Sequence, residues 1–198
     1  MTNPSHIPKK SIEEHTIDLI QAYEKESGGR IRPPVPVFDI IEYLGYDIDF
    51  RNDGFYQDRN NLGGLHIDEK LVVINERISN QEGRMNFTAA HEVGHLQLHA
   101  PDLIKDKKKA TIMCRNIDDN IKSKRDPKEV EADMFAAYLL MPSKEVRSSF
   151  FRMNKKPYDL SKKRFIELFR KPQTKRQKGV RIANKIIEIG NFENVSRL

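Results

Sequence analysis

The sequence predicts an α+β fold, in which a small, mainly antiparallel sheet packs against a histidine-rich helix and further helices. Apolar residues recur at helical spacing before and after a central region, and two short alternating segments separated by turn residues lie within that region. Hydrophobic residues make up 37% of the 198 positions. This is enough for one sizeable core and argues against wholesale disorder.

The N-terminal quarter alternates between regular segments and a proline-rich linker. The segment SIEEHTIDLIQAYEKESGG (11–29) predicts an amphipathic helix that ends at its two glycines. The prolines of RPPVPV (32–37) then favour extended chain, because proline fixes its own φ and disfavours helix in the preceding residue. VFDIIEYLG (37–45) predicts a short helix and YDIDF (46–50) a strand.

The rest of the chain supplies a hairpin and several helices. LGGLHI and KLVVIN, with turn residues Asp68 and Glu69 between them, predict the hairpin. Helical patterns follow in NQEGRMNFTAAHEVGHLQLHA, KEVEADMFAAYLLMP, SKEVRSSFFRM and GVRIANKIIEIG. The connector of residues 101–127 is long for a simple loop, and such loops are often functional.

Composition also bears on location. No segment approaches the roughly 18 apolar residues of a membrane span, and the N-terminus lacks the apolar stretch of a secretory signal. The single cysteine, Cys114, cannot form an internal disulfide, so nothing requires an oxidising compartment. We therefore expect a cytoplasmic protein with no membrane partner.

Three of the six histidines lie in AAHEVGHLQLH, from residue 89 to 99. Residues four apart on a helix lie about 40° apart on one face and about 6 Å apart along the axis, so His91 and His95 can bind one ion. Zinc suits them because it accepts neutral imidazoles in a tetrahedral site. Glu92 can then act as general base toward a water at that ion. Gly94, unusual inside a helix, indicates close approach by another segment.

A catalytic zinc needs a third protein ligand, and the segment EVEAD is the better source for it. His99 lies about 80° and 12 Å from the first histidine, too far to join the ion, and is expected in a supporting or helix-end position. Glu129 lies near the apolar face of its predicted helix, whereas Glu131 points toward solvent. Asp133 shares a face with Glu129 and can hold one histidine ring. We favour Glu129 as the ligand, with Glu131 as the alternative.

Together, FTAAHEVGHLQLH and EVEADMFAAYLLMP resemble the ImmA/IrrE family of zinc metallopeptidases. E-x-x-x-D after H-E-x-x-H is also similar to the wider gluzincin pattern. The resemblance covers about residues 10–150 and implies a cytosolic endopeptidase with a minimal zincin-like fold. Known members cleave helix-turn-helix repressors and so switch on genes of mobile genetic elements or stress responses. We accordingly divide the chain into a zinc metallopeptidase domain of residues 1–150 and a basic, mainly helical extension of residues 151–198.

Carried over position by position, the resemblance implies His91 and His95 as zinc ligands and Glu92 as the catalytic glutamate. It implies Glu129 or Glu131 as the downstream acidic ligand. The oxyanion of a peptide hydrolysis needs a further donor. Tyr138, His99, Tyr56 and an arginine are candidates among which the sequence does not choose.

Three function hypotheses follow. The first is a zinc endopeptidase that cuts a cytosolic regulatory protein, by the resemblance a helix-turn-helix repressor. The second is a zinc-scaffold binding module that docks such a partner without cutting it, but Glu92 would have no use there. The third is nucleic-acid binding, because the net charge is +6 and basic residues concentrate in 105–109 and 162–181. No RNA-binding signature or Cys/His finger accompanies them, so nucleic acid is not expected as the primary partner.

Overall fold

The computed structural model describes residues 9–52, 61–101, 112–116, 126–153 and 175–190. In these residues helices and strands follow one another along the chain, which confirms the predicted α+β class. The elements are α1 (Lys9–Ser27), α2 (Val37–Tyr43), β1 (Asp47–Arg51), β2 (Asn61–His66), β3 (Leu71–Asn75), η1 (Glu76–Ile78), α3 (Glu82–Leu98), β4 (Ile112–Asn116), α5 (Pro127–Leu140), α6 (Ser143–Met153) and α7 (Lys175–Gly190).

The strands form one four-stranded sheet with the order β1-β3-β2-β4. β2 pairs antiparallel with β3 and with β4, while β1 pairs parallel with β3. The predicted hairpin and the mainly antiparallel character of the sheet are therefore confirmed. β4 corrects the prediction for residues 101–127, which treated them only as a connector. Its partner β2 lies far earlier in the chain, so no local hairpin pattern marks this strand.

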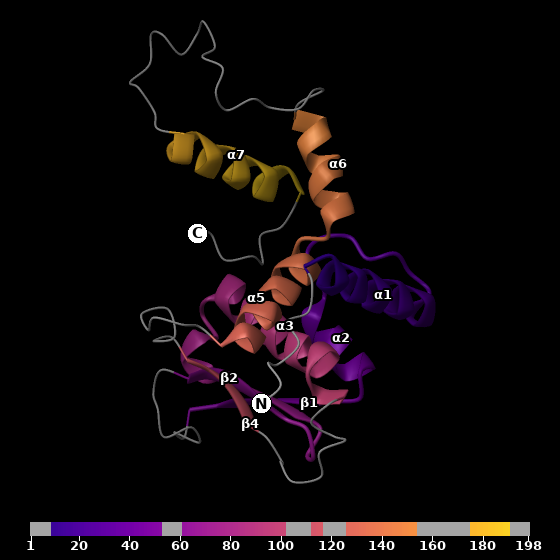
Figure 1. Cartoon of the computed structure of the whole chain (residues 1–198), viewed down its shortest axis with the longest axis vertical. Helices are drawn as coiled ribbons and strands as arrows, with labels where there is room; N and C mark the ends of the chain where they lie inside the picture. Colours follow the sequence, from indigo (N-terminus) through magenta and orange to yellow (C-terminus); the bar gives the residue numbers. More distant parts are fainter. Residues whose placement is uncertain (1–8, 53–60, 102–111, 117–125, 154–174, 191–198) are drawn as a thin grey trace, which may run out of the picture.

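The helix α3 lies against the sheet, and α5 lies against α3 (Figure 1). Gly63 in β2 is one reason for the close contact with the sheet. A Cβ at this position would lie 2.7 Å from Thr88 Cγ2 and 2.9 Å from the Val73 carbonyl oxygen. Only a residue without a side chain lets the strand approach α3 this closely.

Close contact between α3 and α5 depends on Gly94. A Cβ there would lie 3.0 Å from Ala132 Cα and 3.1 Å from Phe135 Cβ. This confirms the predicted close approach, and the segment that approaches is α5. Side chains on the facing sides of the two helices can therefore reach a common point.

Helix α5 begins and buries one face for reasons visible in its sequence. The Asp126 side chain accepts a hydrogen bond from the Lys128 backbone N–H, and Pro127 occupies the first turn, where its missing N–H costs nothing. The predicted apolar face is buried: Ala132, Phe135, Ala136, Leu139 and Leu140. Burial of each large side chain contributes about 1.5–3 kcal/mol and fixes which carboxylates of α5 face α3.

Helices α6 and α7 contact each other beyond α5, at the top of Figure 1. Ile187 of α7 is buried and belongs to the main apolar core. The proposed division of the chain near residue 150 stays a prediction. In the part of the chain that the structure describes, no helix combines the length and the apolar character that a membrane crossing requires.

Candidate metal centre

The two histidines of the H-E-x-x-H motif face the same point. His91 and His95 are each 1% exposed, and their Nε2 atoms lie 3.0 Å apart. Their rings meet edge to face with centroids 4.6 Å apart. Both sit on α3 one turn apart, as the spacing predicts. Polar residues that occur by chance on an exposed helix would be in solvent, so the burial of both histidines indicates a specific role.

Glu129 of α5 completes the group. Its Oε2 lies 3.1 Å from His91 Nε2, and its Oε1 lies 3.2 Å from His95 Nε2. Among the described residues, His91, His95 and Glu129 form a group whose ligand atoms all lie within 4.8 Å of one another. Two nitrogens from one helix and a carboxylate from its neighbour thus surround one point.

The spacing of these donors fits a zinc ion. Tetrahedral zinc with bonds of about 2.0–2.1 Å places its ligand atoms about 3.3 Å apart. The observed separations of 3.0, 3.1 and 3.2 Å are close to that value. Two imidazoles and one carboxylate are also the donor set of several catalytic zinc sites, which leave a fourth position open. The residues present therefore fit the metal.

The group is electrostatically arranged for a positive charge. Burial alone would lower the pKa of His91, but hydrogen bonds with Asp133 and Glu129 outweigh it and raise that pKa to about 9. Burial alone would raise the pKa of Glu129, yet its hydrogen bonds with both histidines hold that pKa well below its usual range. A proton on His91 thus supplies, in the metal-free protein, a charge that a cation would replace.

Asp133 orients the first histidine, as predicted. Its Oδ1 lies 3.0 Å from His91 Nδ1. A carboxylate at Nδ1 favours a proton on that nitrogen, which leaves the Nε2 lone pair directed at the centre of the group. The i, i+4 spacing of Glu129 and Asp133 on α5 makes both contacts possible at once.

The expectation for Glu131 is wrong. Its carboxylate does not point toward solvent but is 3% exposed, with Oε2 3.1 Å from His99 Nε2. The helical wheel weighed only the apolar residues of α5 and took no account of a polar partner on α3. Of the two glutamates, Glu129 is therefore the one whose carboxylate reaches the paired Nε2 atoms.

His99 takes the supporting position at the helix end that the sequence predicts. It caps α3, and its Nδ1 lies 3.0 Å from His95 Nδ1. Burial lowers the pKa of His99 and outweighs the opposing hydrogen bond with Glu131, which favours the neutral form of the ring. The prediction missed the pairing with Glu131. The spacing of four residues between His95 and His99 is the signal that could have revealed the contact between the two rings.

Glu92 lies next to His91 on α3 and is wholly buried. Its charge is close enough to contribute to the raised pKa of His91. Of the oxyanion candidates, His99 is engaged with Glu131, and Tyr138 packs partly buried against the core. Tyr56 lies outside the described residues.

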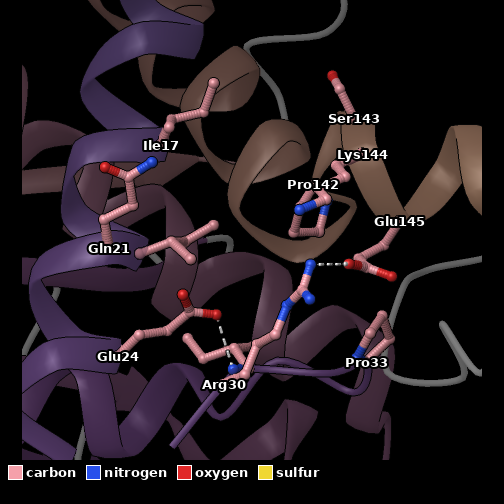
Figure 2. Close-up of a pocket in the computed structure, with 11 residues that line it drawn as sticks. Ile17, Gln21, Glu24, Arg30, Pro33, Pro142, Ser143, Lys144 and Glu145 are labelled. Carbon is pink, nitrogen blue, oxygen red and sulfur yellow. Dashed lines mark hydrogen bonds and ion pairs between the residues drawn. The ribbon is translucent and has the colours of Figure 1, made fainter.

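A separate pocket of about 320 Å³ lies between α1, the linker after it and the start of α6 (Figure 2). Its apolar wall consists of Ile17, Ile20, Ile31, Pro33 and Pro142. At its rim the exposed Arg30 faces Glu145 at 3.7 Å. The pocket has no histidine in its lining and does not include the metal group.

The fold and the His-His-Glu group together define a metallopeptidase-like domain with a small zincin-like architecture. A family model described as the IrrE N-terminal-like domain (Peptidase_M78) matches residues 48–170, which is more than half of the chain. The protein therefore belongs to this peptidase family, as the motifs predicted. A search of curated proteins finds no match to the chain.

Proposed function

We propose that this protein is a zinc-dependent endopeptidase that cleaves a cytosolic regulatory protein. The observation that carries the proposal is the convergence of His91, His95 and Glu129, with the carboxylate of Glu92 buried beside them. Membership of a peptidase family supports hydrolysis of a peptide bond. Burial supports it further, because electrostatic interactions are stronger where water is excluded.

The residues divide the work as follows. His91 and His95 would hold the ion through Nε2, and Glu129 would hold it through its carboxylate. Zinc supplies Lewis acidity, which polarises a carbonyl and acidifies water. Glu92 accepts the proton of the attacking water on its carboxylate and later returns it to the leaving amine. Asp133 keeps His91 in the tautomer that presents Nε2.

The proposed substrate is a helix-turn-helix repressor. The resemblance of the two motifs to the ImmA/IrrE metallopeptidases supports this class. Cleavage of such a repressor in the cytoplasm would link the protein to transcription regulation, including that of mobile genetic elements. The alternative, a module that binds the repressor without cutting it, predicts the same partner but no hydrolysis.

The test uses purified protein and the repressor encoded beside its gene. We expect cleavage by the wild type that a chelator abolishes and added zinc restores. Glu92→Gln should lower the rate by about 10²–10⁴-fold, because it removes the general base while leaving the ligands in place. Glu26→Gln is the matched control, since it makes the same change at an exposed position of α1.

The two candidate functions predict different outcomes for Glu92→Gln. If the variant still binds the repressor and fails to cut it, proteolysis is the activity. If the variant relieves repression as well as the wild type does, the docking alternative replaces the proposal.

A further inference from the structure

The two histidines of the proposed metal group are supported in different ways. Asp133 contacts His91 directly, with Oδ1 3.0 Å from Nδ1. The Nδ1 of His95 lies instead 3.0 Å from the Nδ1 of a third imidazole, that of His99. The opposite nitrogen of His99, Nε2, lies 3.1 Å from Glu131 Oε2. His95 thus reaches a carboxylate through a second ring.

This chain of contacts is shielded from solvent along its whole length. The exposed fractions of His95, His99 and Glu131 are 1%, 4% and 3%. Buried polar groups are costly unless each donor meets an acceptor. In the contacts from His95 through His99 to Glu131, each hydrogen bond must therefore pair one donor with one acceptor.

When His95 binds a cation, one arrangement of protons gives both of these contacts a donor and an acceptor. His95 must then offer the Nε2 lone pair, so its proton is on Nδ1 and donates to His99 Nδ1. His99, as the acceptor there, carries its own proton on Nε2 and donates it to Glu131. Glu131 accepts as a carboxylate, and every donor has one acceptor.

Helix geometry explains why the second support needs an extra ring. Residues two apart on a helix point about 200° apart, so Glu131 cannot aim at the same place as Glu129. His99 follows His95 by four residues, at the C-cap of α3, and so lies about one turn further along the same face. It therefore spans the gap between His95 and the carboxylate on α5.

We propose that His99 and Glu131 are positioning residues of the metal site, which fix the tautomer and ring orientation of His95. Through the two imidazoles, the buried carboxylate makes His95 a stronger ligand. The inference rests on the proposed metal group but not on hydrolysis. Zinc affinity should then depend on Glu131, which acts through His99 and has no contact with the ion.

A purely structural ion pair would behave differently. Breaking a buried pair by removing one partner destabilises the fold whether or not metal is present. Only a positioning role also changes how the folded protein holds a metal. The deciding measurements are therefore zinc affinity, by competition with a chromophoric chelator, and the visible spectrum of the protein loaded with Co²⁺.

The variants are His99→Leu, which removes the acceptor for His95, and His99→Asn, whose side-chain oxygen takes the place of the ring Nδ1 and can accept from His95. We expect His99→Leu to weaken zinc binding by about 10–100-fold and to alter the Co²⁺ spectrum. His99→Asn should recover part of that affinity, because it restores the acceptor for His95. His15→Leu, at an exposed position of α1, is the control and should match the wild type.

Glu131→Gln is the second variant, in case His99→Leu does not fold. It keeps the shape of the side chain and an acceptor for His99 but removes the charge, so we expect about tenfold weaker zinc binding. If folded Glu131→Gln shows wild-type affinity and the wild-type Co²⁺ spectrum, and His99→Leu does so too where it folds, the positioning role is excluded.

The positioning role and the peptidase activity can fail independently of each other. Weakened zinc binding in these variants, combined with a wild type that cuts no repressor, supports the positioning role and counts against the peptidase proposal. A wild type that binds neither Zn²⁺ nor Co²⁺ overturns both.

Discussion

Two regions of the molecule gather acidic and basic side chains between helices, with opposite results. Between α3 and α5, His91 and His95 are each 1% exposed, and Glu129 touches both at 3.1 and 3.2 Å. In the pocket between α1 and α6, the Arg30 side chain is 57% exposed and lies 3.7 Å from Glu145 (Figure 2). The first group is buried and convergent, whereas the second remains in water.

The difference shows what turns charged residues into a site. Exposed ion pairs contribute about 0–1 kcal/mol, because water and salt screen them and the side chains lose entropy. Buried groups cannot exchange partners with water, so each contact restricts the next. The donor atoms of the α3–α5 group therefore converge on one point, while Arg30 and Glu145 make only a single exposed contact.

The largest effect should come from removing the acidic ligand. Glu129→Ala leaves only the two histidine nitrogens as ligands. Loss of a residue that only supports a ligand typically weakens metal binding by at most ~100-fold, and we expect the loss of Glu129 to weaken it more. Glu145→Ala removes a carboxylate from the pocket instead and should leave zinc affinity unchanged. Chelator competition measures both. Equal effects of the two changes would remove the distinction between the regions.

The next effect concerns the contact that brings α3 and α5 together. Gly94→Ala places a methyl group 3.0 Å from Ala132 Cα, and we expect a loss of about 1–3 kcal/mol in the free energy of unfolding. The control is Gly29→Ala, because nothing lies within 4 Å of a Cβ at that position. Urea unfolding of the metal-free proteins gives both values. A neutral Gly94→Ala would show that the helices separate easily.

Much of this architecture follows from local sequence patterns. Apolar residues recur about every 3.6 positions in the helices and every second position in the strands of the β2–β3 hairpin. His91 and His95 are likewise four residues apart, about one helical turn. A short stretch of sequence is enough to reveal each of these patterns. Gly94 and Asp133 were also predicted with their roles, because one lacks a side chain inside a helix and the other shares a face with Glu129. In each case the signal lies on one element, although the contact that it predicts is made with another.

The features that the sequence did not reveal depend on two elements at once. β4 pairs with a strand far earlier in the chain. Glu131 is buried against His99, which caps another helix and supplies its partner. A helical wheel for α5 alone places this glutamate in solvent, since burial of a carboxylate needs a partner that the wheel does not contain.

A smaller effect is the pH dependence of zinc binding. The pKa of His91 is raised to about 9 in the metal-free group, so below that pH zinc must displace its proton. Glu129 carries no proton there, because its pKa is lowered. Affinity should therefore rise about tenfold per pH unit up to about pH 9. Calorimetry in buffers of different ionisation enthalpy should show about one proton released.

Asp133→Asn tests the cause of that dependence. Its carboxylate is a main source of the raised pKa of His91, so the variant should release less than one proton at pH 7.5–8. Zinc binding that does not vary with pH in the wild type would contradict the electrostatic description of the group.

The smallest effect belongs to the pocket between α1 and α6. A double-mutant cycle with Arg30→Gln and Glu145→Gln should give a coupling free energy below about 1 kcal/mol, because the Arg30 side chain is largely exposed. Raising the salt concentration should reduce it further, since exposed charges are screened. A coupling clearly above about 1 kcal/mol would mean that this pair is shielded from water as the α3–α5 group is. The contrast between the regions would then lie in the donor atoms rather than in burial.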